Sequence, residues 1–392
     1  MSVQAPTQRR ILTVLVAAQV LSGVGLTAGV AYGGLLTQDM LGTTSLVGLS
    51  SAASTAGAAL AAVAIGRISQ AHGRPGLAAG YLTGAVGSLG VVAAAVVDSA
   101  AMLLLALFVY GVGMATNLQA RYAGADQAAP TRRARAVSTA LVATTVGGMV
   151  GPNLATLTSE LTDRLGIPYL AGPFVLASIA YATAALILII WLRPDPLLLA
   201  SHTTPSRPTP EGQGLLFGAS IMALTQLVMV AVMTMTPVHI HNHGHGTAAS
   251  GFVIAVHIGA MYLPSPLTGW LVDRYGPRKI AAASGLTLLA AGIVAASVPD
   301  DAILQFAVAL ALLGIGWNFG LVSGTAVIAD AAPTSTRAKV QGTVDVSVAI
   351  AAATGGMASG LVVTAASYPF LALSSGILAI AIVPAAIHSR TF

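Results

Sequence analysis

Residues 250–279 read SGFVIAVHIGAMYLPSPLTGWLVDRYGPRK, and this stretch decides the fold that we predict. Its first part, about 250–272, is apolar and long enough for a helix to cross the hydrocarbon core of a bilayer. The charged residues Asp273, Arg274 and Arg278 follow directly, as expected where a helix leaves the membrane. The stretch therefore predicts a membrane-spanning helix that ends in a short charged loop.

The rest of the chain repeats this alternation of apolar segments and short polar loops. Of the 392 residues, 56% are hydrophobic and 7% are charged, a composition from which no soluble surface can be built. We therefore predict an all-α integral membrane protein with twelve transmembrane helices. The predicted spans are 11–35, 44–67, 76–97, 101–122, 137–158, 171–192, 214–238, 250–272, 279–298, 302–328, 341–364 and 370–388.

The basic residues orient these spans. With the N-terminus inside, 16 of the 17 Lys and Arg residues fall at cytoplasmic ends or loops, and only Arg164 lies outside. The positive-inside rule then predicts an even number of spans and two cytoplasmic termini. The net charge of +5 arises from this asymmetry and does not indicate nucleic-acid binding. Arg9 and Arg10 precede an apolar run that is too long for a signal peptide, so we interpret it as the first span.

Separate motifs recur at one constant distance along the chain. Gly66 corresponds to Gly269, and Pro130 corresponds to Pro333, each pair being 203 residues apart. A constant offset between independent motifs predicts two copies of one six-helix plan.

A polar segment separates the two copies. Residues 194–213 contain five prolines, a composition typical of an inter-domain loop. We therefore predict two pseudo-symmetric six-helix bundles, at 1–193 and 214–392, joined by a cytoplasmic loop.

The segment Gly269–Lys279 resembles the signature of the major facilitator superfamily between the second and third helices of each half. The resemblance covers the whole chain, although Gln70 stands in the first-half copy where Asp273 stands in the second. It implies the fold of that superfamily, with two halves that rock around a central substrate site. We expect Asp273, Arg274 and Arg278 to pair with helix ends and act in gating, while the same charges also serve as a topology signal.

Two pairs of soft ligands are the candidate functional residues. Met229-x-x-x-Met233 lies in span 214–238, and His257-x-x-x-Met261 lies in span 250–272. Four-residue spacing places each pair on one helix face. In an antiparallel hairpin, Met229 is level with Met261 and Met233 with His257, because each pair is equidistant from the loop midpoint. Thioether and imidazole ligands select Cu(I), which predicts a copper site.

Each of these residues also has a simpler interpretation. Methionine fills irregular gaps in apolar cores, and this interpretation suits Met222 on the same helix. A histidine inside a span is costly and indicates function. The His257 imidazole can bind metal, titrate with protons, or bond to a neighbouring backbone carbonyl.

Four of the eight histidines form the run His239, His241, His243 and His245 between the two spans. Short histidine-rich tracts are typical of metal binding. The topology places the run outside, where we expect a loop that captures metal. A polar loop without a role, or a site for zinc or nickel, is the alternative.

The two motifs together resemble the CcoA-type bacterial copper importers of the superfamily, which carry Met-x-x-x-Met on helix 7 and His-x-x-x-Met on helix 8. This resemblance implies import of a copper ion or a small copper complex, with no resident cofactor, by a monomer in the bacterial inner membrane. The chain contains no cysteine, so the ligands must be Met and His.

Two other functions compete with copper import. Gly147-x-x-x-Gly151-Pro152 resembles a fifth-helix motif often associated with antiporters, which favours a proton-coupled exporter of small organic compounds. A membrane metal sensor is disfavoured because the chain has no soluble output domain. Asp345 is a candidate proton carrier or an interfacial residue, and no catalytic constellation indicates an enzyme.

Overall fold

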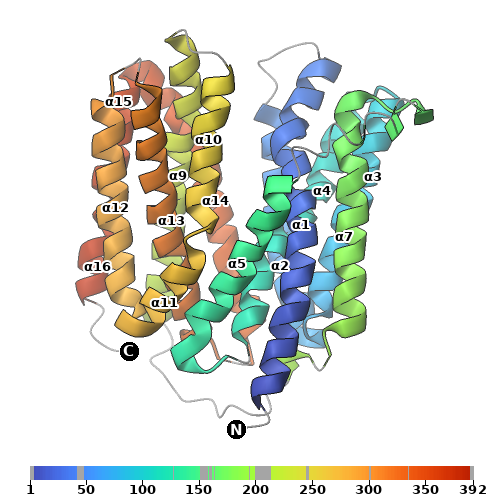
Figure 1. Cartoon of the computed structure of the whole chain (residues 1–392), viewed down its shortest axis with the longest axis horizontal. Coiled ribbons are helices and arrows are strands. Elements are labelled where there is room, and N and C mark those ends of the chain that lie inside the picture. The colour runs from blue at the N-terminus through green and yellow to red at the C-terminus, as the bar shows by residue number, and fades with distance from the viewer. Residues whose placement is uncertain are drawn as a thin grey trace. The chain divides into compact units, whose positions relative to one another are not determined.

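The computed structural model describes residues 4–41, 48–126, 128–150, 158, 161–162, 164–193, 195–198, 213–243, 247–299, 302–333 and 335–388. These residues are largely helical, and no β-strand occurs among them (Figure 1). Within this described part, 11 helical segments are long and apolar enough to cross a membrane. The predicted all-α membrane architecture is confirmed.

Two of the twelve predicted spans fall partly outside the described residues, namely 44–67 at its first four residues and 137–158 in its second half. The predicted span 137–158 begins in α5, which covers Arg133–Val150. Most of the residues between Val150 and Leu161 are not among those that the structure describes, and they include Gly151 and Pro152 of the antiporter-like motif.

The chain divides into two compact units. Unit 1 comprises Met1–Ala128, Thr139–Ser206 and Pro333–Val346, and unit 2 comprises Ala129–Ser138, Arg207–Ala332 and Ser347–Phe392. Each unit thus combines most of one sequence half with one short segment from the other half. The exchanged segments contain the first turns of α5 and of α14, which covers Arg337–Ala365.

Unit 1 is built around aromatic residues and glycines. Besides parts of α5 and α14, it contains α1 (Gln4–Leu41), α2 (Gly48–His72), α3 (Pro75–Val96), α4 (Ala100–Ala125) and α7 (Gly172–Trp191). Tyr81 of α3 stacks on Tyr181 of α7, with ring centroids 5.8 Å apart. A methyl group on Gly84 would lie 2.6 Å from the Cα of Gly113, so α3 and α4 pack backbone against backbone.

A buried polar network also crosses unit 1. Gln19 of α1 accepts a hydrogen bond of 2.6 Å from the Tyr81 hydroxyl and donates one of 3.2 Å to Thr144 of α5. Asn117 of α4 donates a 2.6 Å bond to Ser22 of α1. These residues satisfy one another, as polar groups inside a membrane protein must.

Unit 2 has α13 (Ile303–Ala331) in contact with most of its neighbours. The other helices are α9 (Gln213–Asn242), α10 (Thr247–Tyr262), α11 (Ser265–Tyr275), α12 (Pro277–Ser297), α15 (Tyr368–Ala379) and α16 (Ile382–His388). Helix α13 packs against α9, α10 and α12, whereas α9 and α10 contact each other only sparsely. The predicted span 250–272 is interrupted after Tyr262, where Pro264 precedes α11. Proline lacks the N–H that would continue the helix.

Candidate functional site

The His-x-x-x-Met pair lies where α10 approaches α13 most closely. A methyl group on Gly314 of α13 would lie 2.7 Å from the carbonyl oxygen of His257 and 3.0 Å from the backbone nitrogen of Met261. Only a glycine fits at such a distance without displacing the neighbouring helix. Helix α13 therefore holds the backbone of the predicted ligand pair.

His257 is completely buried, and its two ring nitrogens have different surroundings. Nδ1 lies 2.8 Å from the backbone carbonyl oxygen of Leu310 on α13. Because a carbonyl only accepts, Nδ1 carries the proton and Nε2 keeps a lone pair. Nε2 is buried and has no hydrogen-bond partner among the described residues. His257 therefore makes the bond to a neighbouring backbone carbonyl that was one of the three predicted roles of this residue. The bond leaves Nε2 available as a ligand.

Met261 lies one turn beyond His257 and is 7% exposed. Its backbone carbonyl accepts a 2.7 Å hydrogen bond from the side-chain amide of Asn318 on α13. The same amide group donates to Ser265, and its oxygen accepts a 2.5 Å bond from Thr268. Asn318 thereby fixes the interruption between α10 and α11, directly beside the ligand pair.

The second pair is on α9. Met229 is buried, and Met233 is partly buried. Pro237 lies inside α9 and has no N–H to donate to the carbonyl of Met233. Convergence of Met229 and Met233 with His257 and Met261 around one ion stays a prediction. Met222 packs against Gly324 of α13, which agrees with its interpretation as a core filler.

The sequence analysis did not predict a cluster of Trp317, Gln226 and Tyr262 that lies beside these pairs. Trp317 of α13 donates a 2.7 Å hydrogen bond from Nε1 to the side-chain oxygen of Gln226 on α9. Tyr262 of α10 meets the Trp317 ring edge to face, with centroids 5.6 Å apart. The available signal was the polar Gln226 within an apolar span, on the same helix face as Met222 and Met229. Its partner on another helix was not predictable from spacing.

The prediction that the histidine run begins a loop is wrong for its first two members. Helix α9 continues through Pro237 to Asn242, so His239 and His241 lie on the helix. Packing explains the extension, because the His239 ring stacks on Tyr368 at 4.4 Å between centroids. His243 is exposed at the helix end, and its Nδ1 lies 2.8 Å from the His239 carbonyl.

The metal-capture role of this run stays a prediction. His245 lies outside the described residues, and His241 is described only as part of the helix backbone. Among the residues that the structure describes, no group of three or more His, Cys, Asp and Glu side chains is placed to hold a metal ion.

Asp273 of the signature segment bonds to the N-terminus of α5. Its two carboxylate oxygens accept hydrogen bonds from the backbone N–H groups of Ala134 at 3.0 Å and Arg135 at 3.2 Å. A carboxylate at a helix N-terminus satisfies free donors and complements the helix dipole. Asp273 and Arg133 also line a shallow cavity of about 240 Å³. Arg274 is exposed and Arg278 partly buried, and the gating role of all three stays a prediction.

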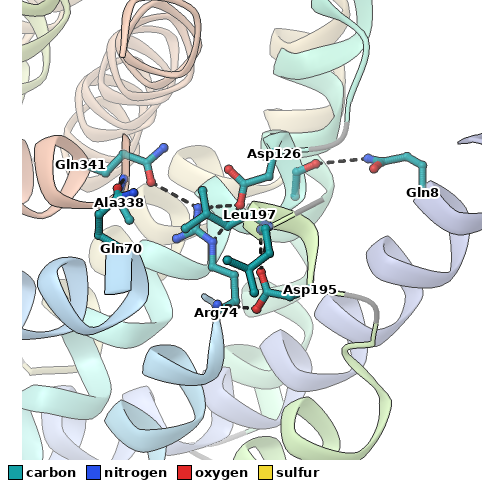
Figure 2. A network of polar contacts seen from close by, with 10 residues as sticks. Gln8, Gln70, Arg74, Asp126, Asp195, Leu197, Ala338 and Gln341 are labelled. Carbon is teal, nitrogen blue, oxygen red and sulfur yellow. Dashed lines mark hydrogen bonds and ion pairs between the residues drawn. The ribbon is translucent and has the colours of Figure 1, made fainter. Parts of the chain in front are cut away.

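The first-half copy of the signature makes an equivalent contact with a neutral residue. The side-chain oxygen of Gln70 accepts a 2.9 Å bond from the backbone N–H of Ala338, in the first turn of α14. Nearby, Arg74 forms a buried ion pair with Asp126 at 2.7 Å and donates to Gln341 (Figure 2). Gln70 therefore makes the same kind of contact with α14 that Asp273 makes with α5, although Gln70 carries no charge.

The comparisons with known proteins establish the family. The model of the Major Facilitator Superfamily matches residues 14–263 and 215–390, and the chain belongs to this superfamily of membrane transporters. A relative from Bacillus subtilis (strain 168), described as the uncharacterized MFS-type transporter YdeG, is 48% identical, and the alignment covers 99% of this chain and 93% of that one.

Two further similarities concern a second relative and a solved structure. The riboflavin transporter RfnT of Brucella anthropi is 30% identical, with 87% of this chain and 86% of RfnT covered. The crystal structure of the human organic anion transporter MFSD10 matches with a TM-score of 0.79 at 15% identity, over 97% of this chain and 99% of that chain. The latter similarity concerns the fold alone.

Proposed function

We propose that this transporter imports copper, as Cu(I), by alternating access through Met229, Met233, His257 and Met261. The observation that carries the proposal is the state of His257. A metal-binding histidine commonly donates its other ring N–H to a backbone carbonyl, which fixes the tautomer and orients the ring. The Leu310 carbonyl serves in this way, and the buried Nε2 has no hydrogen-bond partner in the described part of the chain.

The neighbouring groups suit a cuprous ion. Met261 is next to His257 on α10, and thioethers are soft, neutral ligands that can lie in a membrane without burying a charge. In this proposal, copper is the cargo and not a resident cofactor. His239 and His243, with rings 4.3 Å apart, lie at one end of α9 and would serve as the entry site.

The proposed location follows from the basic residues. The distribution of Lys and Arg supports two cytoplasmic termini, and the similarity to transporters from bacteria supports a bacterial cytoplasmic membrane. We propose that the protein works as a monomer.

Uptake of radioactive copper by cells that express the chain tests the proposal. The double variant Met233→Ile with His257→Leu should accumulate no more copper than cells without the transporter. Met222→Leu is the matched control, because Met222 packs in the core beside Gly324, and it should retain uptake. Accumulation at the wild-type level in the double variant would remove these residues as ligands.

A second candidate cargo is a planar organic compound. The cluster of Trp317, Gln226 and Tyr262 offers an aromatic surface beside an amide, groups that suit a ring with hydrogen-bonding edges. The similarity to a riboflavin transporter favours the same class. Uptake of radioactive riboflavin in the same cells separates the two functions. Uptake that survives the double variant but fails in Trp317→Ala would favour the organic cargo.

A further inference from the structure

A buried ion pair in unit 1 joins α4 to the beginning of α14. The guanidinium Nη2 of Arg121 lies 2.6 Å from the carboxylate Oδ1 of Asp345, and the two side chains are 0% and 4% exposed. Arg121 also donates to the carbonyl of Leu118 and, over 3.1 Å, to the Tyr122 hydroxyl. Its guanidinium carbon lies 4.3 Å from the centroid of the Tyr122 ring.

Both charges lie within segments that are long and apolar enough to span a membrane. Arg121 is in the span Ala100–Ala125, and Asp345 is in the span Arg337–Ala365. Each ion there depends on its partner, because both side chains are almost completely buried away from solvent. The pairing is incomplete on one side: Oδ2 of Asp345 is buried and accepts no hydrogen bond from the described residues.

The charged neighbours of this pair form a second, separate pair. Arg74 and Asp126 are bonded to each other, and Arg74 also reaches Gln341, one turn before Asp345 on α14. The Arg337 guanidinium is close enough to interact electrostatically with both Asp126 and Arg74. The titratable groups that face Asp345 itself are Arg121 and the Tyr122 hydroxyl, both on α4. Among the described residues, Arg121 is thus the direct counter-charge of Asp345, whereas Asp126 is paired with Arg74.

We propose that Asp345 is the proton-binding site that couples transport by this chain to the proton gradient. One proton adds to a carboxylate oxygen and converts the anion to a neutral carboxylic acid. Arg121 keeps its charge and loses its counter-charge, and an unpaired buried cation is strongly disfavoured. The contact between α4 and the first turns of α14 therefore weakens when Asp345 is protonated and re-forms when it is ionised. The inference does not depend on which cargo is carried.

Thiol labelling of purified full-length protein in detergent tests this inference without a cargo. The chain has no cysteine, so a single introduced cysteine is the only reactive thiol. Ala338→Cys places it at a buried position of α14, beside Gln70, and Thr336→Cys places a reference at an exposed position. The ratio of the two maleimide labelling rates cancels the pH dependence of the thiol itself.

The expected result is a ratio that rises severalfold between pH 8 and pH 5.5. Asp345→Asn, which imitates the protonated state, should give a high ratio at every pH. Asp345→Glu keeps the carboxyl group and should restore the pH dependence, and Asp126→Asn should retain it. Two results would overturn the assignment. One is a labelling ratio that does not change with pH in the protein that keeps Asp345, and the other is a ratio that changes with pH to the same extent in Asp345→Asn.

Transport in proteoliposomes provides the second readout, with copper and riboflavin as probes. For whichever cargo is taken up, Asp345→Asn should lose accumulation driven by a pH gradient and keep exchange of cargo across the membrane. Loss of both activities together with normal labelling at pH 8 would contradict a coupling role. Failure of copper as a cargo would affect the proposed function and leave the labelling result intact.

Discussion

The proposed copper transport depends most on the buried His257 imidazole, which has Nδ1 bonded to the Leu310 carbonyl and Nε2 without a partner among the described residues. We predict that His257→Leu abolishes copper uptake while the protein still folds. The lost hydrogen bond to Leu310 should lower the free energy of unfolding by only about 1 kcal/mol, since the backbone carbonyl remains in its helix. Radioactive copper uptake and the thermal unfolding midpoint in detergent are the measurements. Loss of the folded protein from the membrane would show that His257 is chiefly structural.

The Trp317 indole gives a contrasting residue-scale prediction. Trp317→Phe keeps a ring against Tyr262 but removes the Nε1 donor to Gln226. Under the copper proposal, uptake of copper should stay within about twofold of wild type, because neither residue is among the ligands. The free energy of unfolding should fall by about 1–2 kcal/mol, as one hydrogen bond and some packing are lost. A complete loss of copper uptake in a stable variant would place this cluster in the copper path.

At the scale of elements, the close approach of α10 and α13 sets the position of the His-x-x-x-Met pair. Gly314→Val adds atoms where even a methyl group would lie 2.7 Å from the His257 carbonyl oxygen, so α10 must move. We predict a loss of about 1–3 kcal/mol in unfolding free energy together with a strong decrease in copper uptake. Gly360→Ala is the matched control, because no atom lies within 4 Å of the added methyl group. Equal effects of the two substitutions would mean that the α10–α13 contact is unimportant.

The helix-end contacts give a second prediction at this scale. Asp273→Asn keeps one acceptor oxygen for the N-terminus of α5, whereas Asp273→Ala removes both. The loss in unfolding free energy should therefore be larger for alanine, at about 1 kcal/mol, than for asparagine. Thermal unfolding of both variants in detergent is the measurement. Equal losses would show that the charge, and not the number of acceptors, matters.

Helix type and position followed from the sequence because apolar length alone decides which segments can cross a membrane. The end of α9 did not follow, since stacking of His239 on Tyr368 extends the helix past a proline that favours termination. The pairing of Trp317 with Gln226 also did not follow. Periodicity places a residue on a helix face but does not say which helix lies opposite.

At the scale of the whole molecule, the repeat in the sequence corresponds to repeated contacts in the structure. Gln70 and Asp273, at equivalent positions, each bond to the first turn of a helix from the other sequence half. The ion pair of Arg121 with Asp345 has no counterpart in the predicted motifs, because its partners are 224 residues apart in the chain. Distant pairs of this kind are invisible to motif spacing and appear only once the helices are placed.

X-ray absorption at the copper edge, measured on the purified transporter loaded with Cu(I), shows directly whether Met and His side chains bind the metal. We predict a mixed shell of sulfur and nitrogen around the metal, with the nitrogen contribution lost in His257→Leu and the sulfur contribution reduced in Met261→Leu. A copper environment that contains no sulfur, or that is identical in the wild type and both variants, would contradict it.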